Sequence, residues 1–266
     1  GWKSAKHADQ WTSTLQAYAG PIIGKMDVAL IETAHIMRVL DPVWHTKAET
    51  ASRLRGRVEA ILDWATVHRY RTGDNPARWK GHLEALLPAR SKVSKAKHFA
   101  ALPWRDMKPF MAELRQQNGI GALALQFTIL TAARSGEVRG MEWYEVDFEH
   151  RLWTVPGERM KAGREHRVPL SNAAVELLEQ LKAVKLADTE TVFPSVRDHK
   201  PLSDMTLTAV LRRMQRGDIT VHGFRSSFRD WAAEATDYPQ EMAEMALAHI
   251  VGNKVEAAYR RGDMLE

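Results

Sequence analysis

The chain has 266 residues, of which 44% are hydrophobic and 27% are charged, a composition typical of globular proteins with one large or two ordinary domains. Because it contains no cysteine, disulfides, thiolate metal sites and a cysteine nucleophile are excluded. No apolar run approaches the roughly 18 residues that a membrane helix needs, and no basic and apolar leader opens the chain, so we expect a cytoplasmic protein.

Charge is unevenly distributed along the chain, which carries a net charge of +5. Residues 1–100 hold 16 basic and 9 acidic side chains, whereas residues 101–266 hold 22 and 24. The first part is therefore a basic body for which a polyanion such as DNA or RNA is the obvious partner. A solvated basic face is the alternative, and charge alone does not decide between the two.

The first 88 residues are predicted to form a helical domain. The segment ALIETAHIMRVLDPVW is typical of a helix that ends near Pro42, because a proline disfavours the α conformation in the residue before it. Thr46 with Glu49 three residues later is a capping-box signature, and apolar residues recur behind it at helical spacing. Asn75, which precedes a proline, predicts the start of another helix.

The segment over residues 89–102 is predicted to be an extended basic linker. It has no acidic residue and no clear period, so it resembles neither a helix nor a strand. An ordinary surface loop is the alternative, but the run of positive charge favours a segment that lies along phosphates. Its basic residues are Arg90, Lys92, Lys95 and Lys97.

The second domain, residues 103–266, is predicted to be mainly helical with one small antiparallel sheet. It begins with the helical segments RDMKPFMAELRQQ and GALALQFTILTAA, the second apolar enough to be a core helix. Three short runs rich in valine and aromatic residues follow as candidate strands, WYEVDF, RLWTV and EHRVPL. Ser171 is a plausible N-cap for the helix AAVELLEQLKAV. The expected fold class is therefore mainly α, with a helical first domain and an α+β second domain.

Arg134 is the first candidate functional residue. It follows the most apolar helix of the chain, in TAARSGEV, where an arginine is costly to bury unless it is paired. Glu137, three residues later, is a natural partner. A structural ion pair is one interpretation of the two residues. The other is an arginine held by Glu137 so that its planar guanidinium faces a phosphate.

Two further segments carry basic side chains in unusual places. In HGFRSSFRDWAAE, His222 and Arg225 are three residues apart and share one face of a helix start, which suits an oxyanion. A histidine satisfied within the fold is the alternative. In MKAGREHRV, Lys161 stands between two strand-like runs, where a hairpin lysine can reach into a groove. The alternative is a lysine in solvent, the usual fate of hairpin lysines.

The last candidates lie near the end of the chain, in LAHIVGNKVEAAYRRGD. His249 is followed ten residues later by Tyr259, which two alanines precede and two arginines follow. In isolation, Tyr259 fits a packing residue as well as a chemical one.

These six residues, in the chain order Arg, Lys, His, Arg, His, Tyr, resemble the tyrosine recombinase or phage integrase family. The matching pieces are TAARSGEVRGMEW, MKAGREH, HGFR, LAH and the terminal tyrosine. Other runs, among them ETASRLRGRVEAILDWA and NPARW, look most like integrases of temperate phages and genomic islands. The resemblance covers essentially the whole chain. It implies a SAM-like core-binding domain over residues 1–88 and a catalytic domain of the DNA breaking-rejoining fold over residues 103–266.

The resemblance implies a phosphate clamp. Arg134 and Arg225 match the two arginines of the family that hold the scissile phosphate, and Glu137 matches the acidic residue that steadies the first. The chain departs from the family where the usual T-G before the first arginine is Ala132-Ala133, and where the glycine before the second histidine is Ala248. These changes concern local backbone geometry more than activity. A further departure is Ser226-Ser227, where a His-Thr pair is common.

The resemblance also implies the roles of the remaining residues. Tyr259 matches the nucleophile, which forms a 3′-phosphotyrosine and leaves a free 5′-hydroxyl. Lys161 matches the hairpin lysine, the acid toward that hydroxyl, and His222 matches the first histidine, the base for the tyrosine. His249 matches the second histidine, and no metal, ATP or other cofactor is required.

The implied partners are double-stranded DNA attachment sites, bound by a homotetramer, with a possible DNA-bending host factor and a directionality factor. The setting would be the nucleoid of a bacterial host. We expect the basic first domain, the linker and the hairpin to hold the DNA backbone. The residues expected to contact DNA are Arg53, Arg55, Arg57, Lys92, Lys95, Lys97 and Arg164.

Two other functions are weighed against an integrase. A type IB topoisomerase uses similar residues and would relax supercoils without forming junctions. A DNA-binding regulator without catalysis would be favoured by the loss of any of the six residues, all of which are present. Because the chain opens without a methionine and stops seven residues after Tyr259, we expect part of a longer protein that lacks an arm-site domain and assembles weakly into tetramers.

Overall fold

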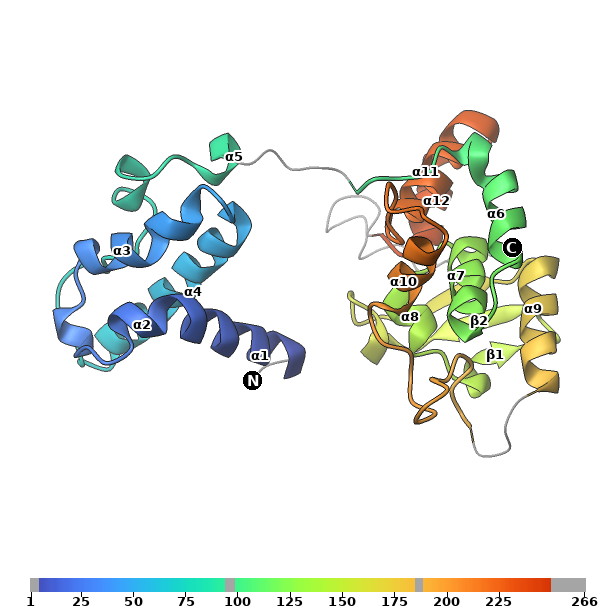
Figure 1. The fold of residues 1–266 in the computed structure, drawn as a ribbon, viewed down its shortest axis with the longest axis horizontal. Coiled ribbons are helices and arrows are strands. Elements are labelled where there is room, and N and C mark those ends of the chain that lie inside the picture. The colour runs from blue at the N-terminus through green and yellow to red at the C-terminus, as the bar shows by residue number, and fades with distance from the viewer. Residues whose placement is uncertain (1–4, 94–98, 185–188, 250–266) are drawn as a thin grey trace. The chain divides into compact units, whose positions relative to one another are not determined.

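The computed structural model describes residues 5–93, 99–184 and 189–249. Contacts between Cα atoms divide the chain into two compact units, Gly1–Lys97 and His98–Glu266 (Figure 1). Within the described ranges, no helix combines the length and the apolar character that crossing a membrane requires.

The first unit is helical, as predicted. Its core forms where α3 packs on α4, around Ile36, Leu40, Leu54 and Leu62, which are almost completely buried. The elements in chain order are α1 (Ala5–Thr14), the π-helical η1 (Leu15–Ala19), α2 (Gly20–Ile23), the 3₁₀ helix η2 (Val28–Leu30), α3 (Thr33–Trp44), α4 (Ala48–Val67), the 3₁₀ helix η3 (Leu83–Ala85) and α5 (Arg90–Val93).

The prediction that a helix stops near Pro42 is wrong, because α3 continues through this proline to Trp44. Val43 and Trp44 are both buried in the last turn of the helix. The indole Nε1 of Trp44 also donates to the carbonyl of Pro88 at 2.9 Å. The packing of this turn offsets the loss of the helical hydrogen bond that a proline, which has no N–H, cannot donate.

Two predicted helix caps are also wrong, although a helix does begin within two residues of Thr46. Thr46 donates its hydroxyl to a carbonyl of the preceding helix, and α4 begins after Lys47 without a side-chain cap. Asn75 accepts from the backbone N–H of Ala77 at 2.9 Å, yet turns rather than an α-helix follow. Its amide nitrogen donates to the carbonyl of Glu59 on α4, so tertiary contacts decide the course of this segment.

The expected extended conformation of the basic segment is wrong for Arg90–Val93, which forms the short helix α5. Arg90 makes an ion pair with Glu49 of α4, so this part of the segment is attached to the first unit. Residues 94–98 lie outside the described residues, and with them Lys95 and Lys97.

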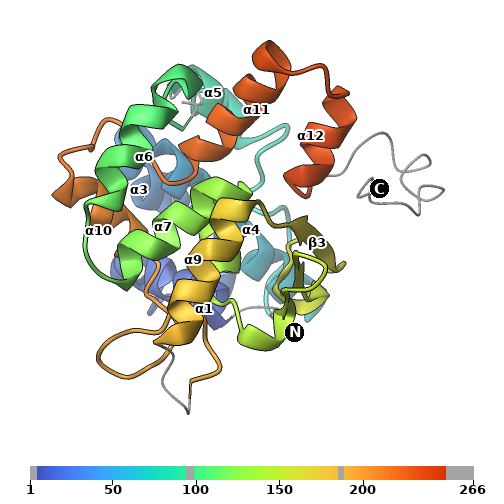
Figure 2. The ribbon, with the colours of Figure 1, turned by 90° about the vertical axis from the view of Figure 1, so that its right-hand side faces the viewer.

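The second unit is built around α7, a helix that is apolar on nearly all sides. It contacts α6, α8, α9 and α10, and Figure 2 shows α6 and α9 beside it. The elements are the 3₁₀ helix η4 (Trp104–Asp106), α6 (Met107–Arg115), α7 (Ile120–Thr131), α8 (Ser135–Arg139), η5 (Trp143–Glu145), β1 (Val146–Asp147), β2 (Leu152–Val155), η6 (Gly157–Arg159), β3 (His166–Pro169), α9 (Asn172–Ala183), α10 (Thr206–Arg213), α11 (Gly223–Ala235) and α12 (Gln240–Ala246).

The three strands form one antiparallel sheet in the order β1-β2-β3, which confirms the predicted small sheet. Trp153 of β2 pairs with Val168 of β3, and both side chains are buried against the core. Of the run WYEVDF, only Val146–Asp147 is strand, since a 3₁₀ turn occupies the residues before it. Ser171 caps α9 as predicted, accepting from the N–H of Ala174 at 3.4 Å.

Candidate active site

Arg134 stands at the start of α8, immediately after the core helix α7. The backbone of Ala132 at the end of α7 is left-handed, with φ 51°, and this turn brings Arg134 to the N-cap position of α8. Glu137 is buried, and its two oxygens accept from the Arg134 side chain at 2.7 Å and from the Arg134 backbone N–H at 2.8 Å. The predicted pairing of these two residues is confirmed.

Arg225 enters the site from the first turn of α11 and is only 5% exposed. Its Nη1 donates to the carbonyl of Ala132 at 2.5 Å, and its Nη2 donates to the carbonyl of Leu247 at 2.5 Å. Burial, together with the charge of Arg134, lowers the pKa of Arg225 to about 10. The side chain therefore keeps its positive charge at neutral pH in a site of low solvent access.

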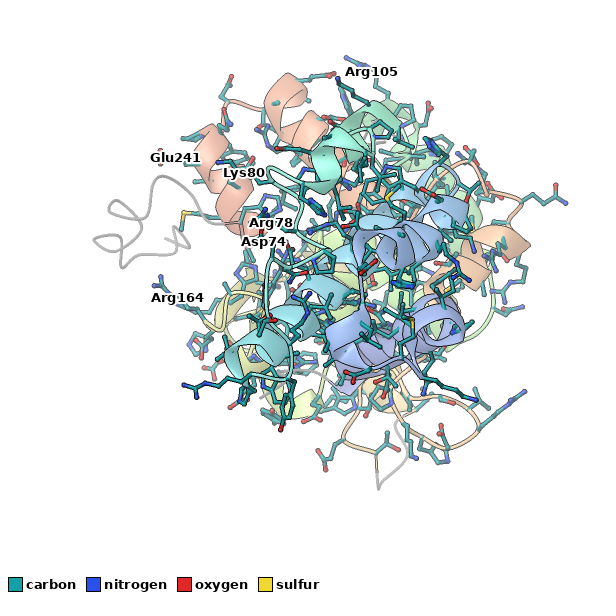
Figure 3. The ribbon with its side chains drawn as sticks, turned by 90° about the vertical axis from the view of Figure 1, so that its left-hand side faces the viewer. Asp74, Arg78, Lys80, Arg105, Arg164 and Glu241 are labelled. Carbon is teal, nitrogen blue, oxygen red and sulfur yellow. The ribbon has the colours of Figure 1, made fainter. Side chains whose placement is uncertain are left out.

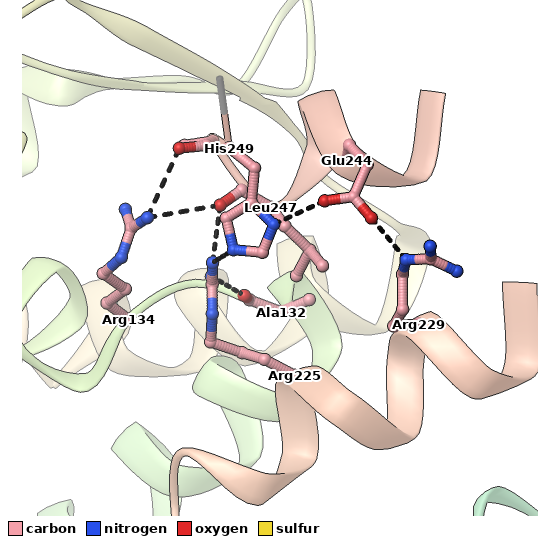
Figure 4. A network of polar contacts seen from close by, with 8 residues as sticks. Ala132, Arg134, Arg225, Arg229, Glu244, Leu247 and His249 are labelled. Carbon is pink, nitrogen blue, oxygen red and sulfur yellow. Dashed lines mark hydrogen bonds and ion pairs between the residues drawn. The ribbon is translucent and has the colours of Figure 1, made fainter. Parts of the chain in front are cut away.

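Both arginines converge on the short segment that follows α12, residues 247–249 (Figure 4). Arg134 Nη2 donates to the carbonyl of Ala248 at 3.3 Å. Nε2 of His249 lies 3.3 Å from Nη2 of Arg225. Three of the predicted residues, far apart in sequence, are thereby in one network.

His222 occupies the N-cap position of α11, three residues before Arg225. Its ring meets Phe99 edge-on, with ring centroids 4.5 Å apart. Partial burial lowers the pKa of His222, and the positive charges of Arg225, Arg134 and His249 lower it further. His222 thus belongs electrostatically to the same cluster, with its neutral form favoured.

Gly223 allows α11 to pack closely against Ala100 and Ala101, at the start of the second unit. A Cβ at this position would lie 2.2 Å from the carbonyl oxygen of Ala100. That carbonyl accepts from the backbone N–H of Thr220 at 2.9 Å, and Ser227 donates its hydroxyl to the carbonyl of Leu102. The end of the predicted linker is therefore packed beneath the helix that carries His222 and Arg225.

The two remaining predicted residues are not placed in this network. Lys161 lies in the exposed connection between η6 and β3. Tyr259 lies outside the described residues. Among residues 5–93, 99–184 and 189–249, no group of three or more His, Asp or Glu side chains is arranged to hold a metal ion.

His166 is a residue near the site that the sequence analysis did not single out. Burial lowers its pKa, the charges of Glu137, Arg134 and Arg225 act on it, and it is hydrogen-bonded to the backbone of Ala246. It stands on β3, two residues before the buried Val168. The alternation in EHRVPL already places both residues on one face of the strand, a signal that could have identified it.

An ion pair between Arg159 and the buried Glu145 lies next to Glu137. Arg159 donates to the carbonyl of Glu137 at 3.1 Å and to the carboxylate of Glu145 at 2.5 Å. The indole of Trp153 donates to the same carboxylate at 2.9 Å. Gly140 leaves room for Arg159, because a Cβ there would lie 2.7 Å from its guanidinium. No sequence motif pointed to this arrangement.

The three arginines expected to contact DNA from α4 differ in exposure. Arg57 is buried and donates to the carbonyl of Gln10 at 2.6 Å, and burial lowers its pKa. Arg55 is largely covered and pairs with Glu59 at 2.6 Å. Arg53 pairs with a glutamate one turn earlier, but 63% of its side chain remains exposed. Arg53 is therefore the one of the three with an accessible guanidinium.

The other expected DNA contacts lie on the surface. Lys92 is exposed on α5. Arg164 is exposed beside Lys161, and Figure 3 shows it projecting away from the ribbon.

Two family models match the chain. The model described as "Phage integrase central domain" matches residues 1–82, and the model described as "Phage integrase family" matches residues 102–266. The integrase of Enterobacteria phage P4 is 32% identical over 96% of this chain, and prophage integrase IntA of Escherichia coli K12 is 28% identical over 98%. The alignments cover 61% and 62% of these two relatives, so the chain spans about three fifths of their length.

Solved structures share the fold. A lambda integrase (75–356) dimer bound to a COC′ core site matches with a TM-score of 0.69 and 20% identity, covering 98% of this chain and 90% of that one. A lambda integrase tetramer bound to a Holliday junction matches with a TM-score of 0.69 and 18% identity, covering 99% and 74%. The chain belongs to the phage integrase family of tyrosine recombinases, with a central domain followed by an integrase domain.

Proposed function

We propose that this chain is the core-binding and catalytic part of a site-specific DNA recombinase that integrates or excises a prophage or genomic island through a 3′-phosphotyrosine. The observation that carries the proposal is the convergence of Arg134 and Arg225 on residues 247–249, with His249 in contact with Arg225. Two guanidinium groups and two imidazoles gathered in this way suit a phosphate diester better than any neutral substrate.

The two arginines would neutralise the charge that grows on the nonbridging phosphate oxygens. A guanidinium matches two such oxygens and keeps its charge, so a pair of them can take the part that metal ions have in other phosphoryl transfers. The burial of Arg225 strengthens this interaction, because water screens a buried charge less. Glu137 holds Arg134 by one hydrogen bond to its guanidinium and a second to its backbone N–H.

The proton transfers would involve His222 and Lys161. The phenol oxygen of Tyr259 attacks phosphorus and gives its proton to His222, while the bond from phosphorus to the 5′-oxygen breaks. Lys161 gives a proton to that oxygen, which leaves as a hydroxyl. The lowered pKa of His222 supports this assignment, because a base must be neutral before it accepts a proton. The 5′-hydroxyl of a partner strand then reverses the step.

The partners would be double-stranded DNA attachment sites and three further copies of the protein. Solved lambda integrase structures contain a dimer on a core site and a tetramer on a Holliday junction, and this chain shares their fold. Arg53, Lys92 and Arg164 have exposed side chains that can reach DNA phosphates. Lys95 and Lys97 extend the same basic segment in sequence. Such an enzyme would act at the bacterial nucleoid, with DNA-bending and directionality factors.

A nicked DNA substrate that spans the junction between the integrated element and the host chromosome tests this function. The nick releases a short 5′-hydroxyl strand after cleavage, so a covalent protein–DNA complex accumulates. We expect Tyr259→Phe to abolish the complex, whereas Tyr238→Phe, which changes an exposed tyrosine, leaves it unchanged. A complex that still forms with Tyr259→Phe would refute the nucleophile assignment. Relaxation of supercoils without any junctions would favour a type IB topoisomerase instead.

A further inference from the structure

We propose that Glu244, held by Arg229, is a positioning residue for His249. It fixes the imidazole in one orientation and one tautomer beside the arginine clamp, the pair Arg134 and Arg225. The proposal rests on the proposed function, since His249 is taken to act on the scissile phosphate. Neither Glu244 nor Arg229 belongs to the six residues that carry the resemblance to the family.

His249 is held by Glu244 at two points. The Nδ1 of the ring lies 2.6 Å from the Oε2 of Glu244, and the backbone N–H of His249 donates to the Glu244 carbonyl at 2.9 Å. The opposite ring nitrogen, Nε2, lies 3.3 Å from Nη2 of Arg225 (Figure 4). The ring is therefore fixed on both edges, with its Nε2 edge toward the clamp.

Glu244 is fixed in turn by α11. Arg229 bonds through its Nε to the second carboxylate oxygen, Oε1. Arg229 stands four residues after Arg225, so the same face of α11 carries the clamp arginine and the arginine that holds the carboxylate. The bond to His249 lowers the pKa of Glu244, and the bond and charge of Arg229 lower it further, so that the carboxylate is charged at neutral pH.

A carboxylate at Nδ1 determines which ring nitrogen carries the proton. In the neutral ring, Nδ1–H donates to Glu244, and Nε2 is left to accept from Arg225. In the charged ring both nitrogens donate, and Nε2–H faces the place where Arg225 would hold a phosphate oxygen. Without Glu244, the neutral ring could place its proton on Nε2 and rotate away from the clamp. The other charged or titratable groups around this site are Arg134, Glu137, His166 and His222.

The backbone just before His249 is left-handed. Ala248 has φ 48°, and α12 has already ended at Ala246. His249 therefore lies outside the regular turns of α12, and both its backbone and its ring are bonded to a single residue, Glu244.

The first test reads the tautomer of His249 by ¹⁵N NMR of the full chain labelled at histidine nitrogens, with the resonances assigned by their loss in His249→Gln. We expect the Nδ1–H tautomer in the wild-type chain and in Glu244→Gln, whose amide oxygen still accepts. We expect Glu244→Ala to shift the ring toward the Nε2–H tautomer. An unchanged tautomer in Glu244→Ala would overturn the proposal. This readout needs no activity, so it stays decisive if the proposed function fails.

The second test measures single-turnover formation of the covalent complex on the nicked DNA. We expect Glu244→Ala to slow it by roughly tenfold to a hundredfold, a part of what a positioned acid–base group contributes, with Glu244→Gln restoring most of the rate. Asp237→Ala, which removes an exposed carboxylate from the connection between α11 and α12, serves as the control. Equal slowing by Glu244→Ala and Glu244→Gln would indicate a structural ion pair and overturn the proposal. Absence of the complex in the wild-type chain would instead refute the proposed function.

Discussion

Ala132 and Ala248 both have a left-handed backbone, with φ 51° and 48°, and each offers its carbonyl to one arginine of the site. The carbonyl of Ala132 accepts from Arg225 at 2.5 Å, and the carbonyl of Ala248 accepts from Arg134 at 3.3 Å. Both alanines lie in segments where the sequence departs from the pattern of the family it resembles, the pair Ala132-Ala133 before Arg134 and Ala248 before His249. The left-handed conformation favours glycine at Ala132 and Ala248, since a Cβ is disfavoured there.

Replacing either alanine by glycine should therefore stabilise the chain. A left-handed residue with a Cβ costs about 1–2 kcal/mol, and the greater freedom of glycine in the unfolded chain offsets about 0.4–1 kcal/mol of the gain. We expect Ala132→Gly and Ala248→Gly to raise the free energy of unfolding by up to about 1 kcal/mol, measured by urea denaturation. Ala133→Gly is the matched control, because Ala133 is not left-handed, and it should be destabilising. Equal losses in all three variants would contradict the strain argument.

Because Arg225 is buried, we expect its replacement by lysine to be more damaging than the replacement of Arg134 by lysine. Arg225 is 5% exposed and bonds two carbonyls on different segments, which a single ammonium group cannot reach together. Each buried carbonyl left without a partner costs about 1–3 kcal/mol, and burial also favours an uncharged lysine. We expect Arg225→Lys to lower both the free energy of unfolding and the rate of covalent complex formation more than Arg134→Lys does. Similar losses in both variants would show that burial is not decisive.

The pH dependence of DNA cleavage should reflect His222. The pKa of His222 lies below the ordinary value of about 6.5, chiefly because of partial burial. The neutral base is therefore present at a pH above this lowered pKa, and it is lost as the pH falls through the lowered pKa. The rate at limiting DNA, which reports on the free enzyme, should fall on the acid side with a midpoint below about 6.5.

His222→Gln provides the comparison for this pH profile. The variant should be slower by about 10²–10⁴-fold and should lack the acid limb, because glutamine does not titrate. An acid limb that persists unchanged in His222→Gln would assign the titration to another group of the cluster.

The sequence predicted the parts of the site that depend on local spacing. Glu137 is three residues from Arg134 at a helix start, so their pairing follows from the helical repeat. Ser171 caps its helix through its own near neighbours. The predicted helix after Asn75 does not form, and the Asn75 amide nitrogen instead donates to the Glu59 carbonyl on α4. Local signals are overridden where a side chain finds a partner distant in sequence.

The sequence could not predict contacts that tertiary packing creates. Arg159 bonds Glu145 and the carbonyl of Glu137, which are 14 and 22 residues away in the sequence. The conformations of Ala132 and Ala248 follow from helix ends that must turn toward the arginines. Neither type of feature has a periodic pattern, which explains why the sequence indicates the charged residues of the site but not these tertiary contacts around them.

Gly223 gives the sharpest test of how the site is assembled. A Cβ added there would lie 2.2 Å from the Ala100 carbonyl and 2.8 Å from the Cα of Ala101, both of them backbone atoms that cannot rotate away. We expect Gly223→Ala to lower the free energy of unfolding by about 1–3 kcal/mol, the usual cost of overpacking, and to slow covalent complex formation by displacing His222 and Arg225. Gly217→Ala, at a glycine with open space around it, should change neither quantity. If urea denaturation found Gly223→Ala as stable as the wild-type chain, the start of α11 would not depend on this close approach.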